Sequence, residues 1–549
     1  MPLNKITFKP GVNRETTSYG DENGWFDSDL IRFRKGRPEK MGGWTRLTSQ
    51  TIEGVGRSLH TWSTLDNSNL MGLGTESKFY IENGGGYNDI TPIRSTVTLG
   101  SNPLKTGDAG SGILTVTAPA HGAVNGDFVT FSGASGLGGD ITAGVLNQEY
   151  EVTGILDANS YTISARTAGT TLADITVDGV LVPTLVPATG SDTGNGGSSV
   201  VGAYQINVGL NTSTFGAGWG IGFWGRGAWG SAAATPVVTS TLRIWTHDNF
   251  GEDLLVNVRN GGIYYWDKTG GFGSRAVSLD SLAGASSTPT VAKQVLVSDR
   301  DRHIIAFGCD TESNPGVQDP LAIRFSSQES LTDWGATATN TAGELRLGSG
   351  SEIVMAIETR QQVLVFTDES LYAMQYLGPP FTFGVNLVSE NITTMGPLAA
   401  IPVEDNVFWM GLKEFYAYGG TVQRLPCTVR DYVFDDINLA QREKIVASSN
   451  TSFSEVWWFY PSANSDVNDR YVVYNYQQQI WYYGTLERSF WMDRGIFDQP
   501  IAAGPNNYLY TQETGFDDDG SAFTAYIESS QIDIGDGDKF AFIKRMIPD

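Results

Sequence analysis

One short pattern occurs twice in close succession and constrains the fold more than any other feature. Residues 363–374 consist of two apolar four-residue runs on either side of the polar turn Thr-Asp-Glu-Ser. Residues 407–418 repeat this arrangement around Gly-Leu-Lys-Glu. Apolar runs rich in β-branched and aromatic residues, separated by a short polar turn, predict β-hairpins.

The same unit recurs along most of the chain. Weaker or longer copies are found at 69–83, 254–266, 295–307 and 456–476, and 508–510 matches half of another. Most neighbouring units lie roughly 40–50 residues apart, which is the period of β-propeller blades. Each blade buries its faces only against its neighbours, so several are needed to form a core. The sequence therefore predicts an all-β fold, a β-propeller of about six or seven blades.

The spacing of the hairpins also divides the chain into segments. We expect an N-terminal arm over residues 1–50, a first propeller segment over 51–96, an insertion over 97–240, the main blades over 241–515, and C-terminal strands or a platform over 516–549. Within the insertion, alternating apolar positions and Asn-Gly turns predict a small β-barrel or β-sandwich.

A glycine-rich loop over residues 190–230 ends the insertion. It carries Trp219, Phe223, Trp224 and Trp229 between glycines and lacks the Lys-Ser/Thr of a phosphate-binding loop. An apolar loop of this kind is not expected to stay exposed on a soluble monomer. We predict that these four side chains contact a neighbouring subunit, or alternatively their own domain.

Charge and cysteine content exclude several classes of protein. The formal net charge is −24, which argues against a protein that grips nucleic acid by its phosphates. Cys309 and Cys427 are too few for a disulfide framework, and we expect ordinary buried cysteines. The N-terminus lacks the apolar core of a signal peptide, and no apolar run of about 18 residues occurs. We expect synthesis in a cytoplasm without a membrane span.

Candidate catalytic and metal-binding patterns are weak. His121 has no second histidine or cysteine pair at ligand spacing, and the turn Asp517-Asp518-Asp519-Gly520 lacks the spacing of an EF-hand, so we expect a solvated turn. No nucleophile, zinc or phosphate-loop motif is found. We predict no enzyme activity, no catalytic or metal-binding residue, no cofactor and no small-molecule substrate.

Several stretches resemble the tail nozzle (hub) proteins of short-tailed bacteriophages. The arm contains Arg-Phe-Arg-Lys-Gly at 32–36 and Gly-Gly-Trp at 42–44. The blades contain Arg-Phe-Ser at 324–326 followed by Asp333-Trp334. The segment 395–434 gives the strongest match. The resemblance covers the arm and the blades and consists of many weak motifs.

This resemblance implies a structural protein of the virion tail, assembled in the host cytoplasm. It implies a homo-oligomeric ring of six copies below the phage portal and adaptor proteins, which retains the genome and passes double-stranded DNA during ejection. Tail fibres or tailspikes would dock on the outside. The charge of −24 per chain predicts an acidic lumen that repels DNA and keeps it from adhering.

Two alternatives come from other functional classes. A β-propeller that binds or cleaves glycans would use the insertion at 97–240 as a carbohydrate-binding module. It would require an aromatic-floored pocket and a pair of carboxylates at the centre of the wheel. A surface adhesin is the other alternative.

Overall fold

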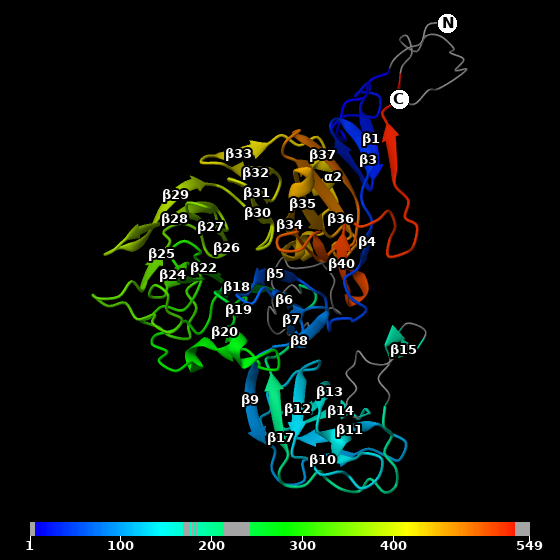
Figure 1. Ribbon diagram of the computed structural model, residues 1–549, viewed down its shortest axis with the longest axis vertical. Helices are drawn as coiled ribbons and strands as arrows, with labels where there is room; N and C mark the ends of the chain where they lie inside the picture. Colours follow the sequence, from blue (N-terminus) through cyan, green and yellow to red (C-terminus); the bar gives the residue numbers. More distant parts are fainter. Residues whose placement is uncertain (1–5, 168–175, 178–179, 182–184, 214–241, 533–549) are drawn as a thin grey trace, which may run out of the picture.

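Seven four-stranded antiparallel sheets form the body of the molecule (Figure 1). The computed structural model describes residues 6–167, 176–177, 180–181, 185–213 and 242–532. The first strands of the seven sheets contact one another in a closed ring, β5–β18–β22–β26–β30–β34–β38 and back to β5. The predicted all-β propeller is therefore confirmed, with seven blades.

The first four blades follow in chain order. The strands of each blade are given from the first, innermost strand to the outermost. They consist of β5 (Ser58–Ser63), β6 (Asn69–Gly74), β7 (Phe79–Asn83) and β8 (Gly86–Asp89); β18 (Trp245–Phe250), β19 (Asp253–Val258), β20 (Ile263–Trp266) and β21 (Val277–Ser278); β22 (Gln294–Val297), β23 (Ile304–Phe307), β24 (Ala322–Phe325) and β25 (Gly343–Arg346); and β26 (Ile353–Glu358), β27 (Val363–Thr367), β28 (Ser370–Gly378) and β29 (Thr382–Glu390).

The last three blades complete the wheel. They consist of β30 (Ala400–Val403), β31 (Asn406–Met410), β32 (Phe415–Tyr418) and β33 (Val422–Leu425); β34 (Val446–Asn450), β35 (Glu455–Tyr460), β36 (Arg470–Asn475) and β37 (Ile480–Thr485); and β38 (Phe490–Met492), β39 (Ile501–Ala503), β40 (Leu509–Gln512) and β4 (Trp44–Arg46). The seventh blade thus takes its outermost strand from the N-terminal arm, with Trp44 opposite Gln512. Joining the two ends of the propeller in one sheet closes the ring.

The hairpins that define the repeat owe their geometry to their turn residues. The hydroxyl of Thr367 accepts hydrogen bonds from the backbone nitrogens of Glu369 and Ser370, the latter at 2.9 Å. Thr75 forms the same turn in the first blade, where its hydroxyl accepts from the nitrogen of Lys78 at 2.8 Å. Side-chain hydrogen bonds of this kind stabilise a turn locally. Apolar runs on both sides then pair into the second and third strands of each blade.

The insertion between the first two blades is a single seven-stranded sheet in the order β10-β11-β14-β13-β12-β17-β9. Its strands are β9 (Ile93–Thr98), β10 (Leu104–Thr106), β11 (Ile113–Thr117), β12 (Phe128–Ser132), β13 (Glu149–Asp157), β14 (Ser160–Ser164) and β17 (Val201–Gln205). Its two halves share one core, across which the hydroxyls of Tyr161 and Tyr204 lie 2.9 Å apart. A closed barrel is not confirmed, because β9 and β10 end the sheet without pairing with each other among the described strands.

The two ends of the described chain meet beside the sixth and seventh blades. β1 (Trp25–Asp29) pairs with β41 (Tyr526–Ser529) in a two-stranded ribbon, and β2 (Ile31–Arg34) pairs with β3 (Arg37–Lys40). Both β1 and β2 contact β37. The sheet β15–β16 (Thr176–Val177 and Val180–Leu181) completes the described strands.

Helices are few and short in the part of the chain that the structure describes. They are α1 (Ala143–Leu146), α2 (Arg430–Asp435) and the 3-10 segments η1 (Lys268–Gly270), η2 (Leu279–Ser281), η3 (Leu439–Lys444), η4 (Thr451–Phe453) and η5 (Pro505–Asn507). No described helix has the length and apolar character that crossing a membrane requires.

Candidate functional site at the propeller axis

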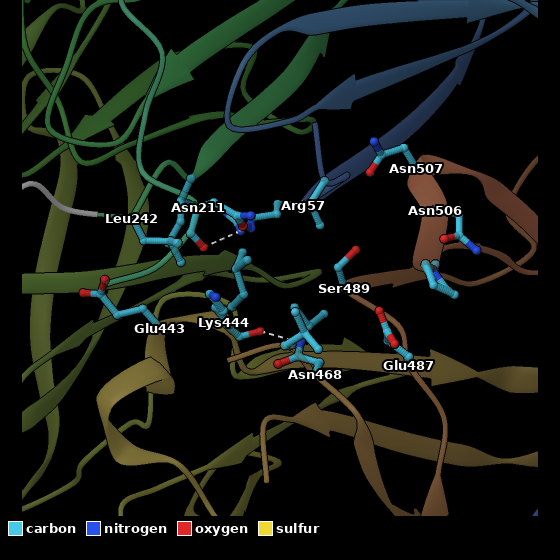
Figure 2. A pocket seen from close by; sticks show the side chains of 17 residues that line it. Arg57, Asn211, Leu242, Glu443, Lys444, Asn468, Glu487, Ser489, Asn506 and Asn507 are labelled. Atoms are coloured by element: carbon cyan, nitrogen blue, oxygen red, sulfur yellow. Dashed lines mark hydrogen bonds between the residues drawn. The ribbon is translucent and has the colours of Figure 1, made fainter. Parts of the chain in front are cut away.

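A pocket of about 90 Å³ opens at one end of the propeller axis (Figure 2). Its walls come from the residues that lead into the first strands of five blades: Arg57, Ile244, Leu398, Lys444 and Ser489. Because first strands surround the axis of a propeller, residues far apart in the sequence meet here. The pocket is therefore formed by the wheel itself.

Arg57 is the most highly connected side chain of the pocket. It is buried, and its guanidinium donates hydrogen bonds to the backbone oxygens of Leu210 at 3.3 Å and of Asn211 at 2.7 Å. It also donates to the side-chain oxygen of Asn211. Burial lowers the pKa of Arg57, although Glu76 acts in the opposite direction. This arginine therefore holds the segment that arrives from the inserted sheet.

Lys444 supplies a second buried cation. It lies at the end of η3, and its ammonium donates a hydrogen bond to the backbone oxygen of Asp466. Burial and the nearby positive charge of Arg57 lower the pKa of Lys444 to about 8. Its own backbone oxygen accepts from the amide of Asn468 at 2.7 Å. Lys444 thus connects the entrance of the sixth blade to the loop before β36.

The pocket lining also includes acidic groups and a hydroxyl group. Glu443 and Glu487 line it, and burial raises the pKa of Glu487. The Ser489 hydroxyl donates to the backbone oxygen of Gly56 at 2.6 Å. Two cations, two carboxylates and a serine that faces a carbonyl make a polar junction between segments of this chain. The serine has no histidine beside it in the pocket lining.

The described flanks of the glycine-rich loop lie at this pocket. Gln441 of η3 exchanges two hydrogen bonds with the backbone of Ser213, at 3.0 and 3.1 Å. Leu210 forms a bridge with Leu242, which lines the pocket. The predicted subunit-contact residues Trp219, Phe223, Trp224 and Trp229 lie outside the described residues.

The opposite end of the axis is acidic. Asp248 lies on β18, Asp299 follows β22 and Glu358 ends β26, so three neighbouring blades bring carboxylates together. The backbone nitrogen of Asp299 donates to Glu358 at 3.2 Å. Burial, followed by the charges of Asp299 and Asp248, raises the pKa of Glu358 to about 7. Across the described residues, no group of three or more His, Cys, Asp or Glu side chains is arranged to hold a metal ion.

A third group of charges fixes the N-terminal arm to the wheel, and we refer to Arg32, Glu455 and Glu513 as the arginine clasp. Arg32 of β2 is 1% exposed, and its Nε lies 2.9 Å from Glu455 Oε1. Its Nη1 donates to Glu513 Oε2 at 2.9 Å. Burial lowers the pKa of Arg32, but Glu455 and Glu513 outweigh it and hold the pKa above its usual value.

The remaining oxygens of the clasp are occupied as well. Tyr482 and Trp457 donate to the two oxygens of Glu455 at 2.6 and 2.9 Å. Glu513 accepts from the Asn450 amide at 3.1 Å and from the backbone nitrogen of Gly42 at 3.2 Å. A buried ion pair is favourable only when its other hydrogen-bonding positions are satisfied in this way.

His121 and the acidic turn at 517–520 are also engaged within the chain. His121 accepts from the backbone nitrogen of Ala123 at 2.9 Å through Nδ1, and its Nε2 lies 3.0 Å from the oxygen of Asp157. Both ring nitrogens are thus occupied. In the turn, Asp518 accepts from the indole of Trp44 at 2.5 Å, and Asp519 forms an ion pair with Arg46 at 2.7 Å. This turn therefore braces β4 instead of facing only solvent.

The two cysteines are free thiols. Cys309 is buried, and burial raises its pKa to about 12, whereas Cys427 is half-buried. Sequence reasoning found neither the axial pocket nor the clasp, because both gather single charged residues from distant segments. The charged segment at 32–36 contains Arg32 and is the one sequence feature that points toward the clasp. By itself it indicates only the family resemblance.

Comparison with known proteins adds little to this geometry. No protein-family model and no curated protein sequence matches the chain. Among solved structures, Hsv2 of Kluyveromyces marxianus is similar over 50% of this chain and 73% of its own, with 7% identity and a TM-score of 0.29. Hsv2 of Kluyveromyces lactis covers 49% and 73%, with 9% identity and a TM-score of 0.30. These scores are too low to support an argument, and the propeller assignment rests on the strand order and the closed ring of first strands.

Proposed function

We propose that this chain is a structural protein of a phage virion, a tail nozzle or hub subunit. In this role six copies form a ring below the portal and adaptor proteins, retain the genome and conduct double-stranded DNA during ejection. Tail fibres or tailspikes dock outside the ring. The observation that carries the proposal is the resemblance to tail nozzle proteins, which extends over the arm at 32–44 and the blade segment at 395–434.

Two further observations support a structural role. The clasp and the axial pocket use their buried charges to hold segments of the chain itself, as expected for a protein that serves as a rigid part. The net charge of −24 would give six copies a strongly negative field, and a lumen lined by carboxylates would repel DNA.

Native mass spectrometry combined with negative-stain imaging tests the proposal. The purified protein, alone or with a portal–adaptor complex, is expected to form a ring with a central hole. A stable monomer that ignores portal particles would contradict the proposal. If that monomer bound or cleaved a polysaccharide, the glycan-directed alternative would replace it.

A further inference from the structure

The fourth blade carries a hairpin, β28–β29, that extends beyond the wheel (Figure 1). Both strands are nine residues long. The other outermost strands, β8, β21, β25, β33, β37 and β4, have two to six residues. The two strands remain paired as far as Gly378 and Thr382, close to the tip of the hairpin. We call β28, β29 and their connecting turn the blade-4 hairpin.

One face of the blade-4 hairpin is anchored to the third blade. Phe383 is 4% exposed and contacts Phe325 and His303, with ring centres 5.0 and 5.2 Å apart. Tyr376 packs on Phe383 at 5.5 Å. These aromatic contacts fix the direction in which the hairpin points. Near its base the other face packs with the fifth blade, where Leu371 and Ala373 share a core cluster with Trp409, so the tip is the part that is presented to the outside.

The outward face is apolar. At the tip, Leu377 and Phe381 are 58% and 73% exposed, and the turn also exposes Pro379 and Pro380. No Asp, Glu, Lys, Arg or His occurs between Leu371 and Ser389. The outer strand β29 carries a single charge, on its last residue, Glu390. A long outer strand with so little charge is a ready template for contact with another chain, and soluble proteins usually protect such edges with charges.

The absence of charge on this surface indicates what covers it. A basic partner would be attracted to the acidic surfaces of this protein and would gain nothing from an uncharged hairpin. An anionic bilayer would be repelled by a chain of net charge −24, and the hairpin offers it no lysine or arginine. Another copy of this chain is equally acidic, and a hairpin tip without charged residues can approach an acidic surface without charge repulsion. The uncharged hairpin therefore fits a second copy best.

The position of the hairpin points to a head-to-tail contact. Figure 1 shows β29 on one side of the wheel and the β1–β41 ribbon on the opposite side. On the ribbon side, Phe516 and Tyr526 are 83% and 47% exposed. Among the described strands, β41 pairs with β1 in a two-stranded sheet. Two different surfaces on opposite sides of one subunit generate closed rings when the rotation between copies closes.

We propose that the blade-4 hairpin of one copy docks against the ribbon side of the next copy, around Phe516 and Tyr526. This inference rests on the proposed ring and assigns the contact that builds it. Leu377 and Phe381 supply the apolar anchors, and the exposed rings of Phe516 and Tyr526 receive them.

Charge insertion at the tip tests the contact. The double variant Leu377→Asp, Phe381→Asp is expected to remain a monomer in native mass spectrometry under conditions where the wild type forms rings. Val317→Asp is the matched control, because Val317 is also exposed, at 57%, but lies on a loop of the third blade. The control is expected to form rings. Rings formed by the double variant would overturn the hairpin contact while leaving the proposed function intact, whereas a wild type that never forms rings would overturn both.

Mixed cysteine variants test the direction of the contact. Phe381→Cys protein mixed with Tyr526→Cys protein is expected to give disulfide-linked dimers under mild oxidation, well above the yield of either variant alone. Equal cross-linking of Phe381→Cys to itself would overturn the head-to-tail arrangement. Flotation with phosphatidylcholine–phosphatidylglycerol vesicles tests whether a lipid bilayer occupies the hairpin instead of a second copy. If wild type floats, and the double variant does not float but still forms rings, a bilayer and not a second copy occupies the hairpin.

Discussion

The arginine clasp and the blade-4 hairpin are opposite departures from the usual distribution of residues. At the clasp, charged side chains lie inside the protein: Arg32 and Glu455 are 1% and 0% exposed. At the hairpin, apolar side chains lie outside, with Phe381 73% exposed. Buried charges and exposed apolar patches both carry a free-energy cost, so each requires an explanation.

The two regions differ in where that explanation lies. Every oxygen of the clasp carboxylates has a hydrogen-bond donor from the same chain, and the purpose of the clasp is visible in the fold: it holds the arm that supplies β4. The base of the blade-4 hairpin is packed against the third and fifth blades, whereas Leu377 and Phe381 at its tip are exposed in the isolated chain. The clasp therefore serves the fold of one copy, whereas the role that we propose for the hairpin lies between copies.

Removing the clasp arginine has the largest expected effect. Arg32→Ala leaves Glu455 and Glu513 buried without a cation, which costs about 3–5 kcal/mol of the free energy of unfolding. Urea unfolding followed by fluorescence measures this loss. Arg34→Ala is the control, because Arg34 lies on the same strand but is exposed, and its loss is expected to stay below about 0.5 kcal/mol. A cost for Arg32→Ala below about 1 kcal/mol would show that the arm is held by other contacts.

A second variant tests the fit of the arm next to the clasp. A Cβ added at Gly43 would lie 2.3 Å from the backbone oxygen and 2.6 Å from the backbone nitrogen of Asp517. Because backbone atoms cannot move aside cheaply, Gly43→Ala is expected to cost about 1–3 kcal/mol, measured by the same urea unfolding.

Gly273→Ala is the control for this variant, since no atom lies within 4 Å of the added Cβ. It is expected to leave the free energy of unfolding nearly unchanged. Equal effects of the two variants would mean that the arm does not approach the turn at 514–517 closely.

Glu358 provides an intermediate case, a half-buried charge whose nearest charged neighbours are carboxylates. Its pKa is raised from 4.5 to about 7, so the folded protein binds this proton more tightly than the unfolded chain. The folded state therefore loses stability as pH rises from about 4.5 to 7, and the penalty is fully present above that range. Glu358→Gln removes the penalty and is expected to be about 1–2 kcal/mol more stable than wild type at pH 8, after allowance for solvent screening.

Thermal or urea unfolding at two pH values measures this effect. The advantage of Glu358→Gln is expected to vanish at pH 4, where the wild-type carboxyl is protonated in both states. An advantage that persists at pH 4 would mean that the acidic end of the axis is not the cause.

The repeating part of the fold could be predicted from the sequence, because each hairpin is local. The runs at 363–374 become β27 and β28, and those at 407–418 become β31 and β32. Even the isolated run at 508–510 lies at β40. In these strands apolar side chains on both faces contact neighbouring blades, so the apolar signal is continuous and strong.

The closure of the ring and the axial pocket could not be predicted in the same way. β4 pairs with β40 across almost the whole chain, and no local pattern specifies such a partner. Arg57 and Lys444 both line the pocket because blade entrances converge on the axis, yet in the sequence each is only a single cation shortly before a strand. Likewise, the sequence shows that 371–389 lacks charge, but only the lengths of β28 and β29 show that this segment extends outward.

The smallest expected effect separates folding from assembly at the blade-4 hairpin. Leu377 and Phe381 are largely exposed in one copy, so the double variant Leu377→Asp, Phe381→Asp is expected to change the free energy of unfolding of the monomer by less than about 0.5 kcal/mol. Urea unfolding at a concentration below that of ring formation measures this, and Phe383→Ala is the contrasting variant. Phe383 is buried against the third blade, and its truncation is expected to cost about 3–5 kcal/mol. A loss above about 1 kcal/mol for the double variant would place the tip among the contacts that stabilise a single copy, and the difference between hairpin and clasp would then disappear.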